Sequence, residues 1–293
     1  MAASFAFDAI GTKWRIDIRD SLSVEHEDSL LEKICARISA YDRAYSRFRP
    51  DSIVTHASKE AGSYVLPQDS EELFSLYKKI YDITEGKVTP LIGDVLVAAG
   101  YDAEYSLTQK EPLTPAYLWD EVLSYKDSVL TVHRPTMIDV GAAGKGHLID
   151  LVSAVIEDYG VASYVVDAGG DIRVRSSEST PLKVGLENPL NLTEVVGVAH
   201  IVNKSICGSA GSRRSWGDFH HIIDPVLLLS PKHIVAVWVV ADTTFLADML
   251  TTALFFVSPE TLSQHFSFEW ALLEDGMNMR YSPQFPGEFF SAG

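Results

Sequence analysis

Cysteine and basic side chains are scarce in this sequence of 293 residues. The two cysteines, Cys35 and Cys207, are too few and too far apart for a disulfide framework or a cysteine-rich metal site, so we expect both to be buried thiols. The 24 Lys and Arg residues are outnumbered by 40 Asp and Glu residues, which gives a net charge of −16. No basic stripe is present that could neutralise nucleic-acid phosphates, so a bound anion would need a local positive charge or a metal ion.

Long apolar runs, repeats and low-complexity segments are also absent. No stretch reaches the length of a membrane span, and the N-terminus lacks the basic and apolar regions of a signal peptide. We therefore expect a cytoplasmic protein with no membrane segment, although a chain whose leader had been removed would look the same. The apolar content of 46% is ample for a buried core, and the length allows one large domain or two.

The hydrophobic pattern predicts a mixture of helices and strands. Apolar residues at helical spacing predict helices at 24–46 and 70–84, and a third helix after the cap residue Asp242 or Thr243. Alternating or β-branched segments predict strands near 6–18, at 163–174 with a tight turn inside, and at 182–187, 195–202, 206–209 and 234–241. We expect antiparallel pairing after residue 160, with helices packed against the sheets.

The segment 138–150 places an aspartate, several small residues and a lysine between an apolar stretch and a helical pattern. Backbone amides at a helix N-terminus, with Lys145 as a positive charge, would suit a phosphate group. The spacing is not that of a P-loop, because Gly141 precedes Gly144 by three residues instead of five and Gly146 replaces the Ser or Thr that holds magnesium. We do not expect an ordinary nucleotide triphosphatase, and a glycine-rich turn with a solvated lysine explains this segment alone equally well.

A carboxylate and a hydroxyl share one face of the last predicted helix. Asp248 and Thr252 are four residues apart, so they project from the same side and could share a hard cation such as magnesium. The simpler interpretation is that Thr252 bonds back to the carbonyl of residue 248 while the Asp248 side chain is solvated.

A histidine and an aspartate flank two β-branched residues just before Pro225. His221 could be a general base or a donor to phosphate, and Asp224 lies three residues further on. Residues three apart do not share one side of a regular strand, so the two side chains would serve different purposes unless the strand turns at Pro225. A half-buried polar pair at a strand end is the alternative.

Five motifs occur in a fixed order along the chain, and three N-terminal segments accompany them. The motifs are Asp-x-Gly-x-x-x-Lys-Gly at 139–146, Asp-Ala-Gly-Gly-Asp-Ile at 167–172, Gly-Ser at 208–209, His-Ile-Ile-Asp-Pro at 221–225 and Ala-Asp-x-x-x-Thr-Ala at 247–253. The segments are Phe-Asp-Ala-Ile-Gly-Thr at 7–12, Ser-Arg-Phe-Arg-Pro-Asp-Ser at 46–52 and a Gly-x-x-x-Pro segment within 86–93. Together they resemble the ApbE family of FAD:protein FMN transferases from about residue 5 to residue 270.

The resemblance implies an α+β fold with largely antiparallel sheets and packed helices. One domain of residues 1–293 would form two joined lobes around an FAD cleft, with a possible lobe boundary near residue 135. The resemblance also implies a magnesium-dependent enzyme that splits the FAD pyrophosphate, transfers FMN to a Thr or Ser hydroxyl of an acceptor protein and releases AMP. A soluble flavoprotein reductase is one possible acceptor.

Carried over by position, the resemblance assigns Asp139 and Lys145 to the FAD site. It assigns the backbone carbonyl of Ala142 and the side chains of Asp248 and Thr252 to magnesium. Further positions that line FAD in the family are Ile10, Phe48, Lys87, Val88, Thr89 and Ile223, and Gly169 and Gly170 lie in the family's glycine-rich turn. By residue type, His221 is the candidate general base, Asp224 could orient it, and Lys145 could assist at the phosphates.

The chain departs from the family pattern at three places around the flavin ring. The family commonly has Met at the position of Ile10, Tyr at the position of Phe48, and Ala-Phe-Asp at 87–89. Phenylalanine keeps an aromatic face but lacks the phenol that a tyrosine would offer. The phosphate chemistry is therefore predicted more firmly than the geometry of flavin binding.

Two other functions remain compatible with the sequence. Water could replace the acceptor hydroxyl, which would make the protein an FAD pyrophosphatase that gives FMN and AMP. The fold could also serve as a non-catalytic flavin-binding protein.

Overall fold

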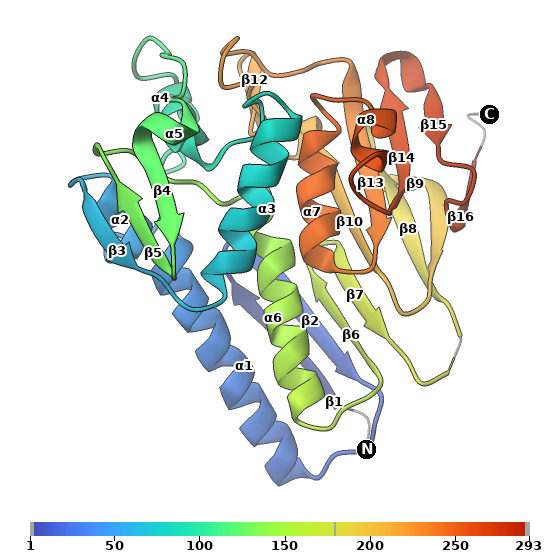
Figure 1. The fold of residues 1–293 in the computed structure, drawn as a ribbon. Helices are drawn as coiled ribbons and strands as arrows, with labels where there is room; N and C mark the ends of the chain where they lie inside the picture. The colour runs from blue at the N-terminus through green and yellow to red at the C-terminus, as the bar shows by residue number, and fades with distance from the viewer. Residues whose placement is uncertain (1–2, 179, 291–293) are drawn as a thin grey trace.

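The computed structural model describes residues 3–178 and 180–290 and is built around one large antiparallel sheet (Figure 1). From one edge to the other, its eight strands are β1 (Ala3–Ala9), β2 (Thr12–Ile18), β6 (Tyr164–Ala168), β7 (Asp171–Arg175), β10 (Ser205–Ala210), β13 (Ile234–Ala241), β14 (Glu269–Glu274) and β15 (Met279–Tyr281). Neighbouring strands are antiparallel throughout. The expected mixed fold with antiparallel pairing after residue 160 is confirmed.

Helices cover one face of this central sheet (Figure 1). The longer helices are α1 (Val24–Tyr45), α3 (Ser70–Ile83), α6 (Gly144–Asp158) and α7 (Thr244–Ala253). The shorter helices and 3-10 turns are α2 (Ile53–Ala57), η1 (Pro90–Ile92), α4 (Gly93–Ala99), α5 (Trp119–Val122), η2 (Gly211–Arg214), α8 (Pro259–Ser263) and η3 (Asp275–Met277). In the described part of the chain, no helix combines the length and the apolar character that crossing a bilayer requires.

Three smaller sheets complete the fold. One consists of β16 (Gly287–Phe289), β9 (Asn191–Ile201) and β8 (Leu182–Asn188), another of β3 (Gly62–Val65), β5 (Val129–Val132) and β4 (Leu123–Lys126), and the third of β11 (Ser215–Trp216) and β12 (Phe219–His220). The first of these packs on the face of the central sheet opposite the helices, where Leu186 and Ala199 join a second hydrophobic core. The central sheet is therefore covered on both faces.

Strand β13 shows how the sequence encodes this double burial. Val237 and Val239 belong to the core on the helical face, whereas Trp238 and Val240 belong to the core beneath β8 and β9. Side chains that alternate between two buried faces require the uninterrupted apolar run that this strand carries. The main core on the helical face includes residues from both sides of position 135, among them Leu30 and Leu250. The lobe boundary near residue 135 stays a prediction.

Most of the long elements lie where the hydrophobic pattern predicts them. The helices expected at 24–46 and 70–84 are α1 and α3, and the strand expected at 234–241 is β13. Helix α7 begins after Thr243, whose hydroxyl accepts a hydrogen bond from the backbone N–H of Leu246 over 3.2 Å. This is the N-cap geometry that the sequence predicts.

Two predictions from the sequence are wrong. Residues 6–18 do not form a single strand, because the chain reverses between β1 and β2 at Ile10 and Gly11, both with positive φ angles of 45° and 74°. Isoleucine is not a typical turn residue at positive φ, so Gly11 alone was the local signal for this turn. Cys35 is exposed on α1, whereas Cys207 is buried as expected.

Candidate active site

Helices α6 and α7 are joined at the centre of the candidate site. The carboxylate of Asp150 on α6 accepts hydrogen bonds from the backbone N–H groups of Thr244 (3.0 Å) and Phe245 (2.8 Å). These amides open the first turn of α7 and would otherwise lack partners, so α6 caps α7 from the side. The cap fixes where the next turn of α7, which carries Asp248, meets the start of α6.

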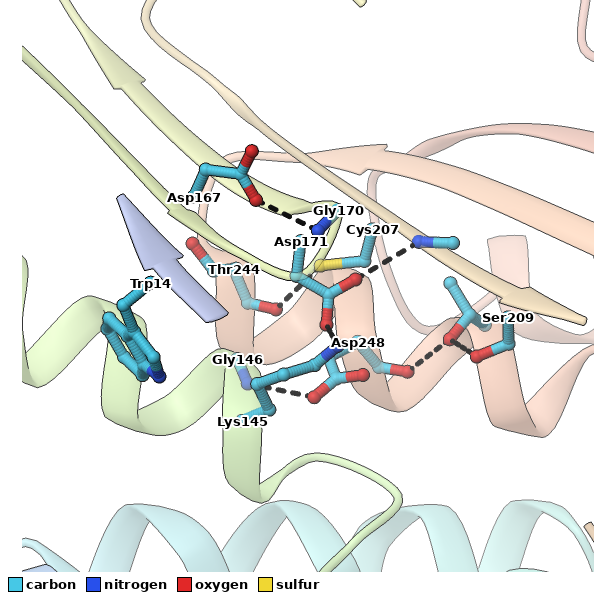
Figure 2. A network of polar contacts seen from close by, with 12 residues as sticks. Trp14, Lys145, Gly146, Asp167, Gly170, Asp171, Cys207, Ser209, Thr244 and Asp248 are labelled. Carbon is cyan, nitrogen blue, oxygen red and sulfur yellow. Dashed lines mark hydrogen bonds and ion pairs between the residues drawn. The ribbon is translucent and has the colours of Figure 1, made fainter. Parts of the chain in front are cut away.

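The start of α6 and the middle of α7 approach each other at Gly146. The backbone N–H of Gly146 donates to Oδ2 of Asp248 over 2.8 Å (Figure 2). A Cβ atom at this position would lie 2.6 Å from Cβ of Asp248 and closer still to the carbonyl oxygen of Thr244. Glycine is therefore required here by the contact between two helices. The absence of a Ser or Thr at this position follows from packing.

Lys145 does not extend into solvent but forms an ion pair inside the site. Its Nζ lies 2.7 Å from Oδ2 of Asp171, whose other oxygen accepts a hydrogen bond from the backbone N–H of Gly208 over 3.2 Å (Figure 2). Burial would lower the pKa of Lys145, but the carboxylates of Asp171 and Asp248 outweigh burial and raise it. The ammonium group is thus charged at neutral pH, and the interpretation of Lys145 as a solvated lysine is wrong.

Asp248 is a buried carboxylate in a cluster that carries more acidic than basic groups. Burial raises the pKa of Asp248 well above its ordinary value, and the Asp171 carboxylate raises it further. Lys145 and the N–H of Gly146 act in the opposite direction but do not cancel these effects. A second cation near Asp248 would relieve this electrostatic cost.

The oxygen atoms around Asp248 suit a hard cation. The hydroxyl of Thr251, and not that of Thr252, donates a hydrogen bond to the backbone carbonyl of Asp248 over 2.7 Å. The Thr251 hydroxyl also lies 2.8 Å from the Ser209 hydroxyl. The Thr252 hydroxyl has no hydrogen-bond partner among residues 3–178 and 180–290, so the simpler interpretation of this pair is wrong. Oδ1 of Asp248 is similarly left for a ligand, since Oδ2 binds Gly146. Carboxylate and hydroxyl oxygens are what magnesium prefers.

The predicted carbonyl ligand, Ala142, lies in the turn between Asp139 and α6. Burial raises the pKa of Tyr77 well above its ordinary value, and the carboxylates of Asp139 and Asp248 raise it further. Within the described ranges, no group of three or more His, Cys, Asp and Glu side chains could hold a metal ion. A cation held at Asp248 would thus depend on hydroxyl, backbone and ligand oxygens, as Ala142 and Thr252 can provide.

Asp139 is held by an arginine that the sequence analysis did not assign. Arg47 forms a buried ion pair with Oδ2 of Asp139, and the backbone N–H of Gly141 donates to Oδ1 over 2.6 Å. Nη1 of Arg47 donates to the carbonyl of Tyr101 over 2.7 Å, while its Nη2 is buried without a partner. The carboxylate of Asp139 therefore shapes the turn before α6 and ties it to Arg47.

The predicted flavin-lining residues fall into two groups. Phe48 contacts the Tyr101 ring at a centroid distance of 5.8 Å, and Ile223 belongs to the same small apolar cluster as Tyr101. Phe48 and Ile223 are thus both associated with the cluster that contains Tyr101. Val88 instead belongs to the main core, and the Thr89 hydroxyl accepts from the backbone N–H of Leu91 over 3.2 Å at the start of η1. Val88 can reach a ligand only through its backbone, and Lys87 beside it is half-buried.

Gly169 and Gly170 form the tight turn between β6 and β7. Both residues have positive φ angles, of 67° and 97°, and the N–H of Gly170 donates to Oδ1 of Asp167 over 2.8 Å. A Cβ atom at Gly169 would collide with the hydroxyl of Thr12, which starts β2. The glycine turn therefore packs against the β1–β2 turn that carries Ile10.

His221 and Asp224 do not form the predicted pair. Oδ1 of Asp224 accepts hydrogen bonds from the backbone N–H groups of Val226 and Leu227, each over 2.9 Å, and so stabilises the following turn. Nδ1 of His221 is buried without a partner. The prediction that Asp224 orients His221 is wrong, because the aspartate side chain points into its own loop. Burial, followed by the charges of Arg214 and His220, lowers the pKa of His221 to about 3.

His147 provides a test of the packing at the start of α6. It is 1% exposed, its Nδ1 lies 3.2 Å from the Tyr41 hydroxyl, and its ring lies 4.7 Å from that of Phe245 on α7. Burial lowers the pKa of His147 to about 4. The unfolded chain, with an ordinary histidine pKa near 6.5, binds a proton that the folded protein excludes between these two values, so stability falls as the pH is lowered through this range.

We expect His147 to account for about 2 kcal/mol of the free energy of unfolding that is lost between about pH 7.5 and pH 5. Urea denaturation of the His147→Gln variant at both pH values should show a pH dependence that is smaller by this amount. The matched control is His56→Gln, at an exposed position on α2, which should keep the wild-type dependence. An equal dependence in wild type and His147→Gln would contradict the assignment.

A sequence model of the ApbE family matches residues 10–269. The chain belongs to the ApbE family. It is 23% identical over 275 residues to an FAD:protein FMN transferase of Escherichia coli, with 86% of this chain and 77% of that protein covered. It is 25% identical over 283 residues to an FAD:protein FMN transferase of Haemophilus influenzae, with 86% and 80% covered.

Solved structures of ApbE proteins share the fold. The ApbE protein of Thermotoga maritima superposes with a TM-score of 0.84 at 18% identity and covers 98% of this chain and 100% of its own. The flavin transferase ApbE of Vibrio cholerae superposes with a TM-score of 0.82 at 17% identity, covering 97% and 98%. The family resemblance found in the motifs is confirmed.

Three charged residues of this ApbE-family site were not assigned from the sequence. Arg47 adjoins Phe48 in a quoted motif, and Asp171 is the second aspartate of the Asp-Ala-Gly-Gly-Asp motif. Arg214 donates to the Tyr101 hydroxyl over 2.9 Å, and its backbone carbonyl accepts from the N–H of His221 over 3.0 Å. For Arg47 and Asp171 the motifs were the available signal, whereas Arg214 lies between two motifs. The side-chain partners Asp139, Lys145 and Tyr101 lie far away in the sequence.

Proposed function

We propose that this protein transfers FMN from FAD to a Thr or Ser hydroxyl of an acceptor protein, with magnesium, and releases AMP. The observation that carries the proposal is the junction of α6 and α7 at Gly146 and Asp248, which places a helix N-terminus, a charged lysine and a buried carboxylate together. The relatives named FAD:protein FMN transferases support the same activity. The acceptor is a separate protein, for example a soluble flavoprotein reductase.

The residues of the α6–α7 junction suit the FAD pyrophosphate. The positive N-terminal end of α6 and the ammonium of Lys145 would attract its anionic oxygens. Asp171 holds Lys145 beside Asp248, so the lysine needs little reorganisation to act there. A magnesium ion held by the Ala142 carbonyl, Asp248 and Thr252 would supply further charge neutralisation on both phosphates.

The proposed reaction is a substitution at the FMN-side phosphorus. The acceptor oxygen forms the new P–O bond, the bond to the bridging oxygen breaks, and AMP leaves with that oxygen. The acceptor hydroxyl loses its proton, and we assign the general base to His221, whose buried Nδ1 has no partner in the protein. Since its pKa is lowered to about 3, His221 is unprotonated at neutral pH, but burial also makes it a weak base, which limits its contribution to the rate.

Replacing His221 by alanine should slow FMN transfer by about 100-fold, because general bases contribute about this much or more. FAD affinity, measured by fluorescence titration, should stay near the wild-type value. His221 in the wild type stays unprotonated as the pH falls through about 6.5, the ordinary histidine pKa. Its titration should therefore cause no decline in the transfer rate in that pH range. The control is His233→Ala at an exposed histidine. A His221→Ala variant with normal FAD binding and a full transfer rate would refute the base assignment.

The overall function is tested by incubating the protein with FAD and magnesium, with and without a candidate acceptor. AMP that forms only with the acceptor, together with a flavinylated peptide in mass spectrometry, supports transfer. AMP that forms equally without an acceptor indicates an FAD pyrophosphatase, and intact FAD in all samples indicates a flavin-binding protein. The flavinylated proteins of the source cell, identified by mass spectrometry, would provide the acceptor.

A further inference from the structure

An aromatic side chain that belongs to no family motif lies directly on Phe48. The ring of Tyr105, from the segment after α4, stacks on the Phe48 ring with a centroid distance of 5.2 Å and an interplanar angle of 12°. Tyr101 contacts both rings edge-on, at 5.8 Å from Phe48 and 5.4 Å from Tyr105. The guanidinium carbon of Arg47 lies 4.2 Å from the centre of the Phe48 ring. Phe48 thus already has one stacked and one edge-on aromatic partner.

The same tyrosine reaches the turn between β1 and β2. A Cβ atom built on Gly11 would lie 3.9 Å from the Tyr105 hydroxyl. Tyr105 therefore spans the space between Phe48 and the Ile10–Gly11 turn, which are two separate segments with predicted flavin-lining positions. Tyr105 is 49% exposed and contacts the buried Tyr101 only edge-on, so its side chain can move outward at a small cost in packing.

Unfavourable backbone conformations occur on both sides of this space. Ile10 and Tyr105 have φ angles of 45° and 52°, and Leu107 has 49°. A β-branched or bulky residue at positive φ is rare, and such conformations cluster at ligand-binding positions. The β1–β2 turn and the turn after α4 are distant in sequence. Both contain residues in unfavourable backbone conformations, and they lie next to each other where Tyr105 approaches Gly11.

The turn that carries Tyr105 is held firmly by Asp102. Oδ1 of Asp102 accepts from the backbone N–H of Ser106 over 2.9 Å, and Oδ2 accepts from its hydroxyl over 2.6 Å. Lys110 lies 2.5 Å from Oδ2, and the N–H of Tyr105 donates to the Asp102 carbonyl over 3.2 Å. The backbone is anchored, so the side chain of Tyr105 is presented in a defined direction.

We propose that Tyr105 is a positioning residue for the flavin ring, which inserts between Phe48 and Tyr105. The present separation of 5.2 Å is too short for a third ring, since two stacked contacts of roughly 3.5 Å each require about 7 Å. Tyr105 would therefore move outward by about 2 Å when FAD binds. Its phenol supplies the hydrogen-bonding group that Phe48 lacks. This inference rests on the proposed function.

The test compares ligands with and without the ring in the variants Tyr105→Ala and Tyr105→Phe. Tyr105→Ala should bind FAD about tenfold more weakly, because one stacking partner is lost, and should bind ADP like the wild type. The fluorescence of bound FAD should increase in Tyr105→Ala, because a stacked tyrosine quenches flavin emission. Tyr105→Phe keeps the stacking face and should retain FAD affinity within about twofold of the wild type.

The matched control is Tyr117→Ala, which removes another partly exposed tyrosine between α4 and α5 that packs against Arg134. It should leave FAD affinity and fluorescence unchanged. Wild-type or tighter FAD binding by Tyr105→Ala, or an equal loss of ADP binding, would overturn the inference while leaving FMN transfer by the wild type intact. If the wild type binds FAD but yields neither AMP nor a flavinylated acceptor, the proposed FMN transfer is refuted. The comparison of FAD binding by the wild type and Tyr105→Ala then still tests whether Tyr105 positions the flavin ring.

Discussion

Replacing Asp248 by asparagine should reduce FMN transfer by roughly 1,000-fold while the protein stays folded. Asparagine has nearly the same size and keeps an oxygen that can accept from the N–H of Gly146, so the α6–α7 contact should survive. It removes the negative charge that we assign to cation binding. AMP release and flavinylation of the acceptor measure the loss, and calorimetric titration with magnesium should show no binding in the presence of FAD.

The control for this variant is Asp242→Asn, just before α7. Asp242 is exposed and pairs with Lys204 over 2.7 Å, so its replacement should leave transfer and magnesium binding unchanged. If Asp248→Asn released AMP at the wild-type rate and bound magnesium normally, the assignment of α7 to the metal site would fail.

The second large effect concerns stability. Gly146→Ala should lower the free energy of unfolding by about 3 kcal/mol, because the new methyl group meets the backbone of α7 and cannot be accommodated by a side-chain rotation. Separation of the two helices should also lengthen or break the hydrogen bond to Asp248, so FAD binding should weaken in parallel. Urea denaturation and fluorescence titration measure the two effects.

Gly62→Ala in β3 is the matched glycine control. A Cβ atom there would meet only the ring of Tyr64, at 3.9 Å, an ordinary contact distance. We expect a change in stability below about 0.5 kcal/mol and normal FAD binding. Gly146→Ala with wild-type stability would show that α6 and α7 can separate freely, contrary to the structure.

The elements predicted best are those whose signal is local. The apolar run of β13 and the cap at Thr243 both lie within a short stretch of chain, and both predictions are confirmed. The β1–β2 turn was missed because Ile10 adopts a conformation that its side chain disfavours. A bond within the same hairpin, from the indole N–H of Trp14 to the carbonyl of Ala9 over 3.2 Å, helps to hold the turn.

The sequence predicted which residues form the candidate site better than it predicted which of them contact each other. The motifs identified Lys145 and Asp248, but periodicity could not show that Lys145 pairs with Asp171 or that Arg47 pairs with Asp139, 92 residues further on. Those pairings depend on how the helices pack on the sheet. The predicted pair of His221 and Asp224 was wrong because a spacing in sequence does not determine where an aspartate in a loop points.

The hydrogen bond between Gly146 and Asp248 joins groups 102 residues apart, so the junction cannot close until both segments of the chain are present. A growing chain that has not yet produced α7 has neither the carboxylate nor the closed junction. If FAD binds at this junction, as we propose, only the completed fold would bind it, and FAD at 100 times its dissociation constant would stabilise that state by about 2.7 kcal/mol. On the proposed function, the supply of flavin would therefore affect the stability of the folded protein through this junction.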